Sequence, residues 1–350
     1  MIFDKVLNSI DEGRNGGNEG IPMGFPRLSN IIPNIQKSRY ITITGGSGSG
    51  KSSFADTAYI FNPLDWYMEN KDKTDIKLHI NYFSFEISEE RIISKQIARK
   101  IYKDTNLILD VNYILSFGKN RISQEHYDLV KKYKNYFDSI EEYLTIYGTE
   151  GHNPTGIRKT LLKYAENNGV FEKDGERLVY RESNPNLYTL NVFDHARLAP
   201  REQGFNVKEN IDKLSEYLLW TRNYCKFTNI LLAQTNRNIG NIERRKLEGE
   251  DLTMSLDDIS DSSNIAQDSD MVLGIINPHK YGLGSYRRYN IEKLQNRARF
   301  LQILKNRDGE ADGTLGMLFI GENGFFKELP RVEDMNDLIY NSIRNLKSSI

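Results

Sequence analysis

The sequence of 350 residues predicts an α/β protein in which helices flank a mostly parallel, twisted sheet. Short apolar segments rich in β-branched residues recur along the chain, and several are separated by helical stretches. Strands that alternate with helices need crossover connections, which make neighbouring strands parallel. A glycine-rich loop also joins the first such strand to a helix. Hydrophobic residues at 38% and charged residues at 27% fit a folded chain rather than a disordered one.

Composition excludes several classes of protein. Basic and acidic residues nearly cancel, 47 against 48, so a nucleic-acid site has to be local. The single cysteine, Cys225, precludes an intramolecular disulfide, and together with the five histidines it shows no zinc-ligand spacing. The first 20 residues lack the features of a signal peptide, and no apolar run approaches the roughly 18 residues of a membrane span. We therefore expect no membrane contact and a cytoplasmic location, in the host cytoplasm if the source is viral.

The N-terminus predicts a short amphipathic helix on a tether, spanning 1–20. Its apolar residues have helical spacing, and glycines then interrupt the pattern from Gly13 to Gly20. The helix either folds back on its own domain or docks on a neighbouring subunit. The main domain is expected over 21–330 and a helical tail over 331–350.

The main domain contains seven predicted strands: 40–44, His79–Phe85, Tyr188–Phe193, Asn229–Ala233, Met271–Ile276, Phe300–Leu304 and Leu315–Ile320. Helices are predicted at Glu89–Tyr102, Gln124–Tyr136, Thr155–Asn167 and Val207–Tyr224. An Asp-Gly turn between alternating residues predicts a β-hairpin at Val170–Tyr180, which we interpret as a surface insertion.

The strongest local signal is the glycine loop after the first strand, GGSGSGKSS. It has a glycine, four residues and then Gly-Lys-Ser, the pattern of a phosphate-binding loop. Glycines let backbone N–H groups turn toward phosphates, Lys51 supplies a cation, and the Ser52 hydroxyl can ligate Mg²⁺. The alternative is an ordinary turn between strand and helix. The candidate residues for binding ATP are Gly45, Gly46, Ser47, Gly48, Ser49, Gly50, Lys51, Ser52 and Ser53.

Two carboxylates follow predicted strands, where ligands of such sheets bind. Glu86 comes after HINYFSF and has the chemistry of a general base for water; the alternative is a cap for the following helix. Asp194 ends YTLNVFD and is a candidate to hold Mg²⁺ with Ser52; the alternative is a strand-end turn.

Gln234 ends a third strand, NILLAQ, where its side chain could sense the γ-phosphate. The polar stretch that follows, from Asn236 to Asp251, is a candidate DNA-contacting loop, and a solvated surface loop is the alternative. Its basic residues are Arg237, Arg244, Arg245 and Lys246.

Lys305 and Arg307 occupy alternate positions in FLQILKNRDGEADGTLGMLFI, which predicts a hairpin. Two cations on one side of a strand can reach a phosphate in a neighbouring subunit, as an arginine finger does. The alternative is a basic strand edge that discourages aggregation.

Taken in order, these segments resemble the C-terminal ATPase domain of DnaB-type replicative helicases, superfamily 4, with a RecA-like P-loop NTPase core. The resemblance begins at GIPMGFPRLSNII, continues through GGSGSGKS, FSFEIS, the FDH aspartate and LLAQTNR, and ends with DDISDSSNIAQDSDMVL and ILKNRDGEADG. It covers roughly 20–329, and its last two segments are the most specific.

The resemblance implies a homo-oligomer, a hexameric ring, that moves on single-stranded DNA, unwinds duplex during replication and contacts a primase or loader. It assigns Glu86 as catalytic base, Gln234 as the coupling residue, and Lys305 and Arg307 as cations acting in trans. The chain departs from the family in three ways. Its glycine loop is similar to that of the phage branch, it lacks the N-terminal helical or primase domain, and it carries the extra 170–180 hairpin.

Two other functions stay open at this stage. One is a RecA-fold, DNA-dependent ATPase that remodels or recombines DNA, or a regulatory ring, without unwinding; KNRDGE and SNIAQDSD argue against it. The other is a structural ring that keeps nucleotide only for stability, and the presence of Glu86 argues against that.

Overall fold

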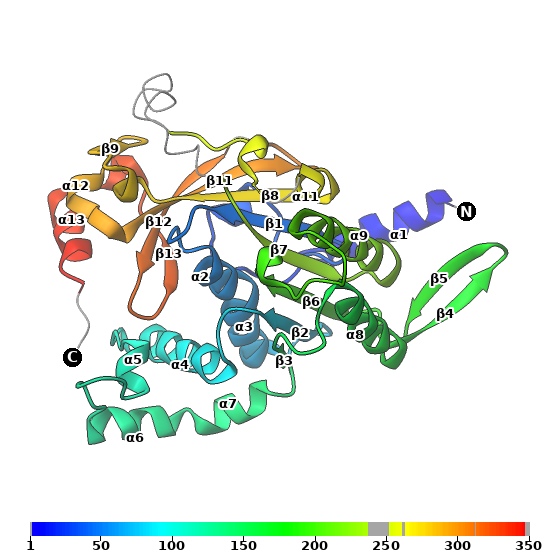
Figure 1. The fold of residues 1–350 in the computed structure, drawn as a ribbon, viewed down its shortest axis with the longest axis horizontal. Helices are drawn as coiled ribbons and strands as arrows, with labels where there is room; N and C mark the ends of the chain where they lie inside the picture. Colours follow the sequence, from blue (N-terminus) through cyan, green and yellow to red (C-terminus); the bar gives the residue numbers. More distant parts are fainter. Residues whose placement is uncertain (1, 237–251, 261–262, 312, 347–350) are drawn as a thin grey trace.

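A mixed sheet of nine strands forms the centre of the fold, in the order β13-β12-β11-β8-β1-β7-β6-β2-β3. The computed structural model describes residues 2–236, 252–260, 263–311 and 313–346. Six strands, from β8 across to β3, run parallel, and the three at the other end are antiparallel. The predicted α/β class with a mostly parallel sheet is therefore confirmed (Figure 1).

The strands of the large sheet are β1 (Tyr40–Gly45), β2 (Lys77–Ser84), β3 (Leu144–Tyr147), β6 (Leu187–Asp194), β7 (Thr228–Gln234), β8 (Met271–Ile276), β11 (Ala298–Asn306), β12 (Thr314–Ile320) and β13 (Phe325–Glu328). Two small ribbons stand outside it, β4–β5 (Gly169–Asp174 and Arg177–Glu182) and β9–β10 (Ser285–Tyr286 and Tyr289–Asn290). The predicted hairpin insertion is the β4–β5 ribbon, which projects away from the body (Figure 1).

The α-helices are α1 (Ile2–Arg14), α2 (Lys51–Ala55), α3 (Asn62–Asn70), α4 (Glu89–Thr105), α5 (Val111–Ile114), α6 (Gln124–Lys132), α7 (Lys134–Ile140), α8 (Pro154–Asn167), α9 (Val207–Cys225), α11 (Ser263–Asp268), α12 (Ile291–Leu294) and α13 (Asp337–Arg344). A π-helical segment, Asp56–Phe61, joins α2 to α3. No helix among these described segments is long and apolar enough to cross a membrane.

Both faces of the parallel strands are buried. On β1, Ile41 and Ile43 point into a cluster that includes Phe54 and Ala58 from the segment after the glycine loop. The neighbouring strand β7 sends Leu231 into the opposite cluster, where α8 and α9 pack. Because helices cover both faces, these strands read as continuous apolar runs rather than alternating ones.

One predicted helix is divided in two. The stretch predicted as a single helix from 124 to 136 forms α6 and α7, which meet at Tyr133. The tight turn lets Tyr133 pack in the small cluster beside α4 and α5, while Tyr136 donates a hydrogen bond to Asp65 of α3 at 3.0 Å. A straight helix could not serve both contacts.

The helix α1 does not fold back on its own domain. Its apolar side chains are exposed, with Ile2 at 84% and Phe3 at 69% of their surface accessible. Figure 1 shows α1 extending from the side of the molecule that also carries the β4–β5 ribbon. Of the two arrangements expected for this helix, the described chain leaves docking on another molecule.

Candidate nucleotide site

The glycine loop occupies the carboxyl end of β1, between Gly45 and the first residue of α2. Gly48 and Gly50 have φ of +72° and +95°, a region that only glycine adopts at low cost. Space is also limited, because a Cβ on Gly45 would lie 2.7 Å from the carbonyl oxygen of Ile275. The Lys51 Nζ lies 3.5 Å from the carbonyl oxygen of Gly46, so the lysine side chain folds back over the loop. This is the local geometry that a phosphate needs.

Ser52 and Asp194 meet directly beside this loop. The Ser52 hydroxyl donates to Asp194 Oδ1 at 3.0 Å, although the two residues come from α2 and from the end of β6. Asp194 is 2% exposed. Burial raises the pKa of its carboxyl to about 7, with a further rise from the charge of Asp56 and a smaller one from Glu86. The hydrogen bond from Ser52 and the charge of Lys95 oppose this rise.

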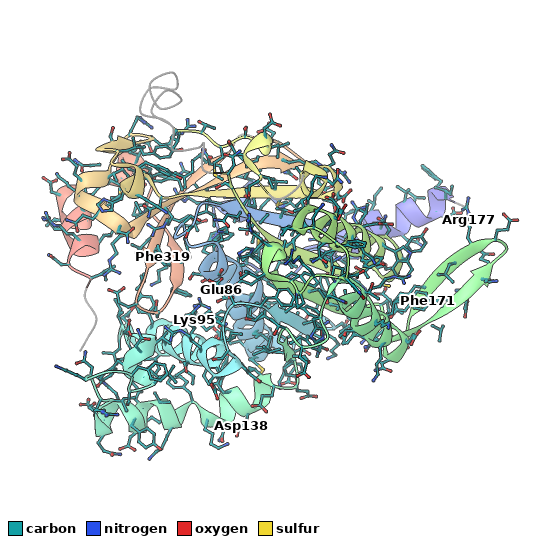
Figure 2. All side chains as sticks on the ribbon, viewed as in Figure 1. Glu86, Lys95, Asp138, Phe171, Arg177 and Phe319 are labelled. Atoms are coloured by element: carbon teal, nitrogen blue, oxygen red, sulfur yellow. The ribbon has the colours of Figure 1, made fainter. Side chains whose placement is uncertain are left out.

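Glu86 lies two residues beyond the end of β2 and is exposed to solvent. Its charge acts on Asp194, as does that of Lys95 from α4, so both side chains border the same site. Figure 2 labels Glu86 and Lys95 between the sheet and α4. The following helix starts at Glu89 with Ser88 at its N-cap position and no side-chain capping bond.

Gln234 shares this edge of the sheet. In the pairing of β1 with β7 it stands opposite Gly45, at the start of the loop. Its backbone carbonyl accepts hydrogen bonds from the backbone N–H of Ser260 at 2.9 Å and from the Ser260 hydroxyl at 2.8 Å. The candidate DNA-contacting residues Arg237, Arg244, Arg245 and Lys246 lie outside the described residues.

Lys305 and Arg307 lie at the opposite edge. Lys305 pairs with Val272 near the start of β8, whereas Gly45 pairs with Ile275 near its end. Three to four residues of strand separate the two edges, or about 10–13 Å at the rise of a β-strand. The two cations therefore face away from the glycine loop of their own chain.

Both cations are held by the segment that ends α11. Lys305 Nζ donates to the carbonyl oxygens of Ala266 at 2.7 Å and Gln267 at 3.0 Å. Arg307 donates to the same Gln267 oxygen at 2.8 Å and to Asp270 Oδ1 at 3.0 Å. The last carbonyls of a helix carry partial negative charge, which favours cations there.

Several residues around the glycine loop were missed from sequence. The buried Arg299 donates from Nε to the carbonyl oxygen of Ser49 at 2.9 Å, and burial lowers its pKa to about 10. Lys280 donates to the carbonyl oxygen of Ser47 at 2.5 Å. The signal for Arg299 was a charged residue within an apolar strand, which needs buried partners. Lys280 lies in a loop and gave no signal.

The oxygen atoms at this site fit Mg²⁺. The Ser52 hydroxyl and the Asp194 carboxylate supply the hard oxygen donors that Mg²⁺ prefers, beside a loop shaped for phosphates. The Oγ of Ser49 and the Oγ1 of Thr235 are buried near the loop without a hydrogen-bond partner, so polar groups remain for a ligand. In the described part of the chain no cluster of three or more histidine, cysteine or acidic side chains forms a metal site of its own.

Comparisons by sequence find no family model and no curated protein that match this chain. Comparison of folds does. One solved structure, the ATPase domain of a helicase, superimposes with a TM-score of 0.68 at 18% identity, covering 93% of this chain and 98% of that one. "The Structure Of A DnaB-Like Replicative Helicase And Its Interactions With Primase" gives a TM-score of 0.66 at 18% identity, covering 93% of this chain and 66% of that one. The chain therefore has the RecA-like fold of the ATPase domains of DnaB-type replicative helicases.

Proposed function

We propose that the chain is an ATP-hydrolysing helicase motor that assembles into a ring, moves on single-stranded DNA and unwinds duplex. One observation carries the proposal. The glycine loop, Ser52, Asp194 and Glu86 converge at one edge of the sheet, while Lys305 and Arg307 are presented at the other. A subunit built in this way holds most of one nucleotide site and completes the site of a neighbour.

At the first edge, each residue has a defined task in ATP hydrolysis. The loop N–H groups and Lys51 bind the phosphates, and Ser52 and Asp194 hold Mg²⁺, directly and through water. Bound Mg²⁺ supplies positive charge to the β- and γ-phosphate oxygens. Glu86 orients a water molecule and accepts its proton, for which an exposed carboxylate beside the site is suited.

At the second edge, Lys305 and Arg307 approach the nucleotide of the adjacent subunit and stabilise charge that develops on the transferred phosphoryl group. A head-to-tail contact of this kind generates a ring when its rotation closes. The exposed apolar side of α1 supplies a further contact between subunits. We propose six subunits, as in the hexameric helicases that the sequence resembles.

Gln234 links hydrolysis to DNA in this scheme. It lies beside the glycine loop, and its backbone holds Ser260 in the segment that follows the basic stretch from 236 to 251. Loss of the γ-phosphate changes the hydrogen bonds available to the Gln234 side chain and so shifts the DNA-contacting segment. One of the structural neighbours is described with its interactions with primase, and we propose a primase or loader as partner here too.

A forked-duplex assay tests the proposal. Wild-type protein should unwind the fork with ATP and Mg²⁺, whereas Lys51→Ala should lose nucleotide binding and Glu86→Gln should bind nucleotide but not hydrolyse it. Arg307→Ala mixed with wild type should reduce activity far below the proportion of wild-type subunits, because each altered subunit also disables its neighbour. Hydrolysis without unwinding would favour a remodelling ATPase, and a ring that binds nucleotide without releasing phosphate would favour a structural role.

A further inference from the structure

A groove of about 630 Å³ lies outside the nucleotide site, between the β9–β10 ribbon and the residues before and after β12 and β13. Its charged lining residues are Arg27, Arg287, Arg288, Arg331 and Glu333. Four arginines against one glutamate make a strongly positive surface in a chain whose total charge is close to zero. Such a concentration of guanidinium groups selects for anions.

Two of these arginines occupy a turn that resists them. Arg287 and Arg288 are the two residues between β9 and β10, with φ of +48° and +66°. A two-residue turn with positive φ at both positions favours Asn-Gly, because a side chain on an L-residue costs roughly 1–2 kcal/mol in this region. Strained positions of this kind tend to persist at functional sites.

Packing below the turn holds this conformation. The Tyr286 and Tyr289 rings contact Phe300 of β11 at centroid distances of 4.6 and 5.4 Å. The Tyr289 hydroxyl donates to the carbonyl oxygen of Pro330 at 2.7 Å, next to Arg331. The two arginines therefore stand on a rigid base and face the opposite wall of the groove.

The walls of the groove already bind carboxylates. Arg288 pairs with the carboxylate of Glu333, which shows that an anion fits between the turn and the opposite wall. Arg27 is committed to the fold, since it pairs with Glu328 at 3.4 Å and donates to the carbonyl oxygen of Leu329 at 2.5 Å. Arg287, Arg288 and Arg331 remain as the residues whose heads lie at the exposed surface of the groove.

We propose that this groove binds the backbone phosphates of single-stranded nucleic acid, at a contact separate from the basic stretch of residues 236–251. The ribbon is joined to the end of that stretch, because the Tyr286 hydroxyl donates to the carbonyl oxygen of Leu252 at 2.6 Å and Arg287 donates to the Thr253 hydroxyl at 3.4 Å. A strand leaving the basic stretch meets the groove next. Only the choice of nucleic acid over another polyanion rests on the proposed function.

The turn itself provides the experiment. Replacing Arg287→Asn together with Arg288→Gly installs the residues that the turn prefers, so the variant should melt at the same or a higher temperature than wild type. Binding of fluorescein-labelled oligo(dT) without nucleotide should nevertheless weaken roughly ten-fold at 0.1 M salt. The slope of log Kd against log salt should fall by about 1.4, or about 0.7 for each phosphate of a single strand that the variant no longer neutralises.

A second variant and a charge-matched control complete the design. Arg331→Ala on the opposite wall should lower the slope by about 0.7, whether or not the turn variant folds. Lys173→Asn with Arg177→Asn removes two cations from the distant β4–β5 ribbon, where Figure 2 labels Arg177, and should leave the slope unchanged.

Equal Kd values and slopes for wild type, the turn variant and Arg331→Ala would overturn the proposal. So would an equal weakening in the control, since the effect would then be one of total charge, or a weakening seen only with a labelled poly-glutamate peptide. DNA-independent ATP hydrolysis separates this test from that of the proposed function. If wild type hydrolyses ATP but binds no oligo(dT), the motor role fails; if wild type binds it and the groove variants bind equally well, only the groove fails.

Discussion

Replacing Asp194 with asparagine should make the nucleotide-free protein more stable while abolishing its Mg²⁺-dependent activity. The carboxyl is 2% exposed, and its pKa is raised from 3.8 to about 7, chiefly by burial. A folded-state pKa above the unfolded value means that the native state keeps a proton that the unfolded chain releases. The stabilisation from that proton is complete below about pH 4 and disappears as the pH rises through 7.

The size of the effect follows from the shift. Three pKa units correspond to at most about 4 kcal/mol between pH 4 and pH 8, and relaxation around the charge reduces it. Asparagine has the shape of the protonated carboxyl and retains an oxygen for the Ser52 hydroxyl, so it should match wild type at pH 5 and exceed it at pH 8. Urea unfolding in EDTA, at one-unit steps from pH 5 to pH 8, measures the difference.

The control is Asp138→Asn, an exposed carboxylate on α7 labelled in Figure 2, whose difference from wild type should not grow with pH. A difference for Asp194→Asn that stays constant with pH, or that shrinks toward pH 8, would refute the reasoning. Titration with a fluorescent ATP analogue should show Mg²⁺-dependent tightening in wild type and little in the variant. Added stability together with an abolished Mg²⁺ response is a combination that a general packing defect cannot produce.

Three further predictions concern other parts of the molecule. Arg299→Lys keeps the charge but loses the fork that holds the Ser49 carbonyl, so the KM for ATP should rise several-fold with a smaller change in kcat, measured by phosphate release. Gly50→Ala should cost more stability than Gly48→Ala in urea unfolding, by about 1 kcal/mol or more, because its Cβ would lie 3.0 Å from the Phe326 ring whereas that of Gly48 meets nothing within 4 Å. Phe3→Asp should shift light scattering toward single subunits and leave the melting temperature of the subunit unchanged, since that side chain is 69% exposed.

Most of the sheet was predictable because its signal is local. Continuous apolar runs such as YITIT form strands buried on both faces, and the glycine loop after Gly45 fixes which end of them carries the site. The seven predicted strands are all present. The short β13 and the β9–β10 ribbon were not predicted, since their few residues gain their structure from packing against β12 and Phe300.

The candidate site divides in the same way. Residues at strand ends, such as Asp194 and Gln234, could be picked from their positions, because parallel strands deliver them to one edge. Arg299 and Lys95 could not be placed, since their roles depend on tertiary contacts with residues far away in sequence. The helix α1 showed its amphipathic pattern, but only the structure shows that the apolar side stays exposed.

The opposite placement of the two halves of the site explains why such a chain needs copies of itself. Within one subunit, Lys305 and the glycine loop stand at opposite ends of β8, and the strand between them is part of the rigid core. No side-chain rearrangement spans about 10–13 Å of buried sheet. The cations become useful only when a second subunit presents its glycine loop to them. ATP hydrolysis per subunit should therefore rise steeply with protein concentration as rings form, and Arg307→Ala should remove that rise without preventing nucleotide binding.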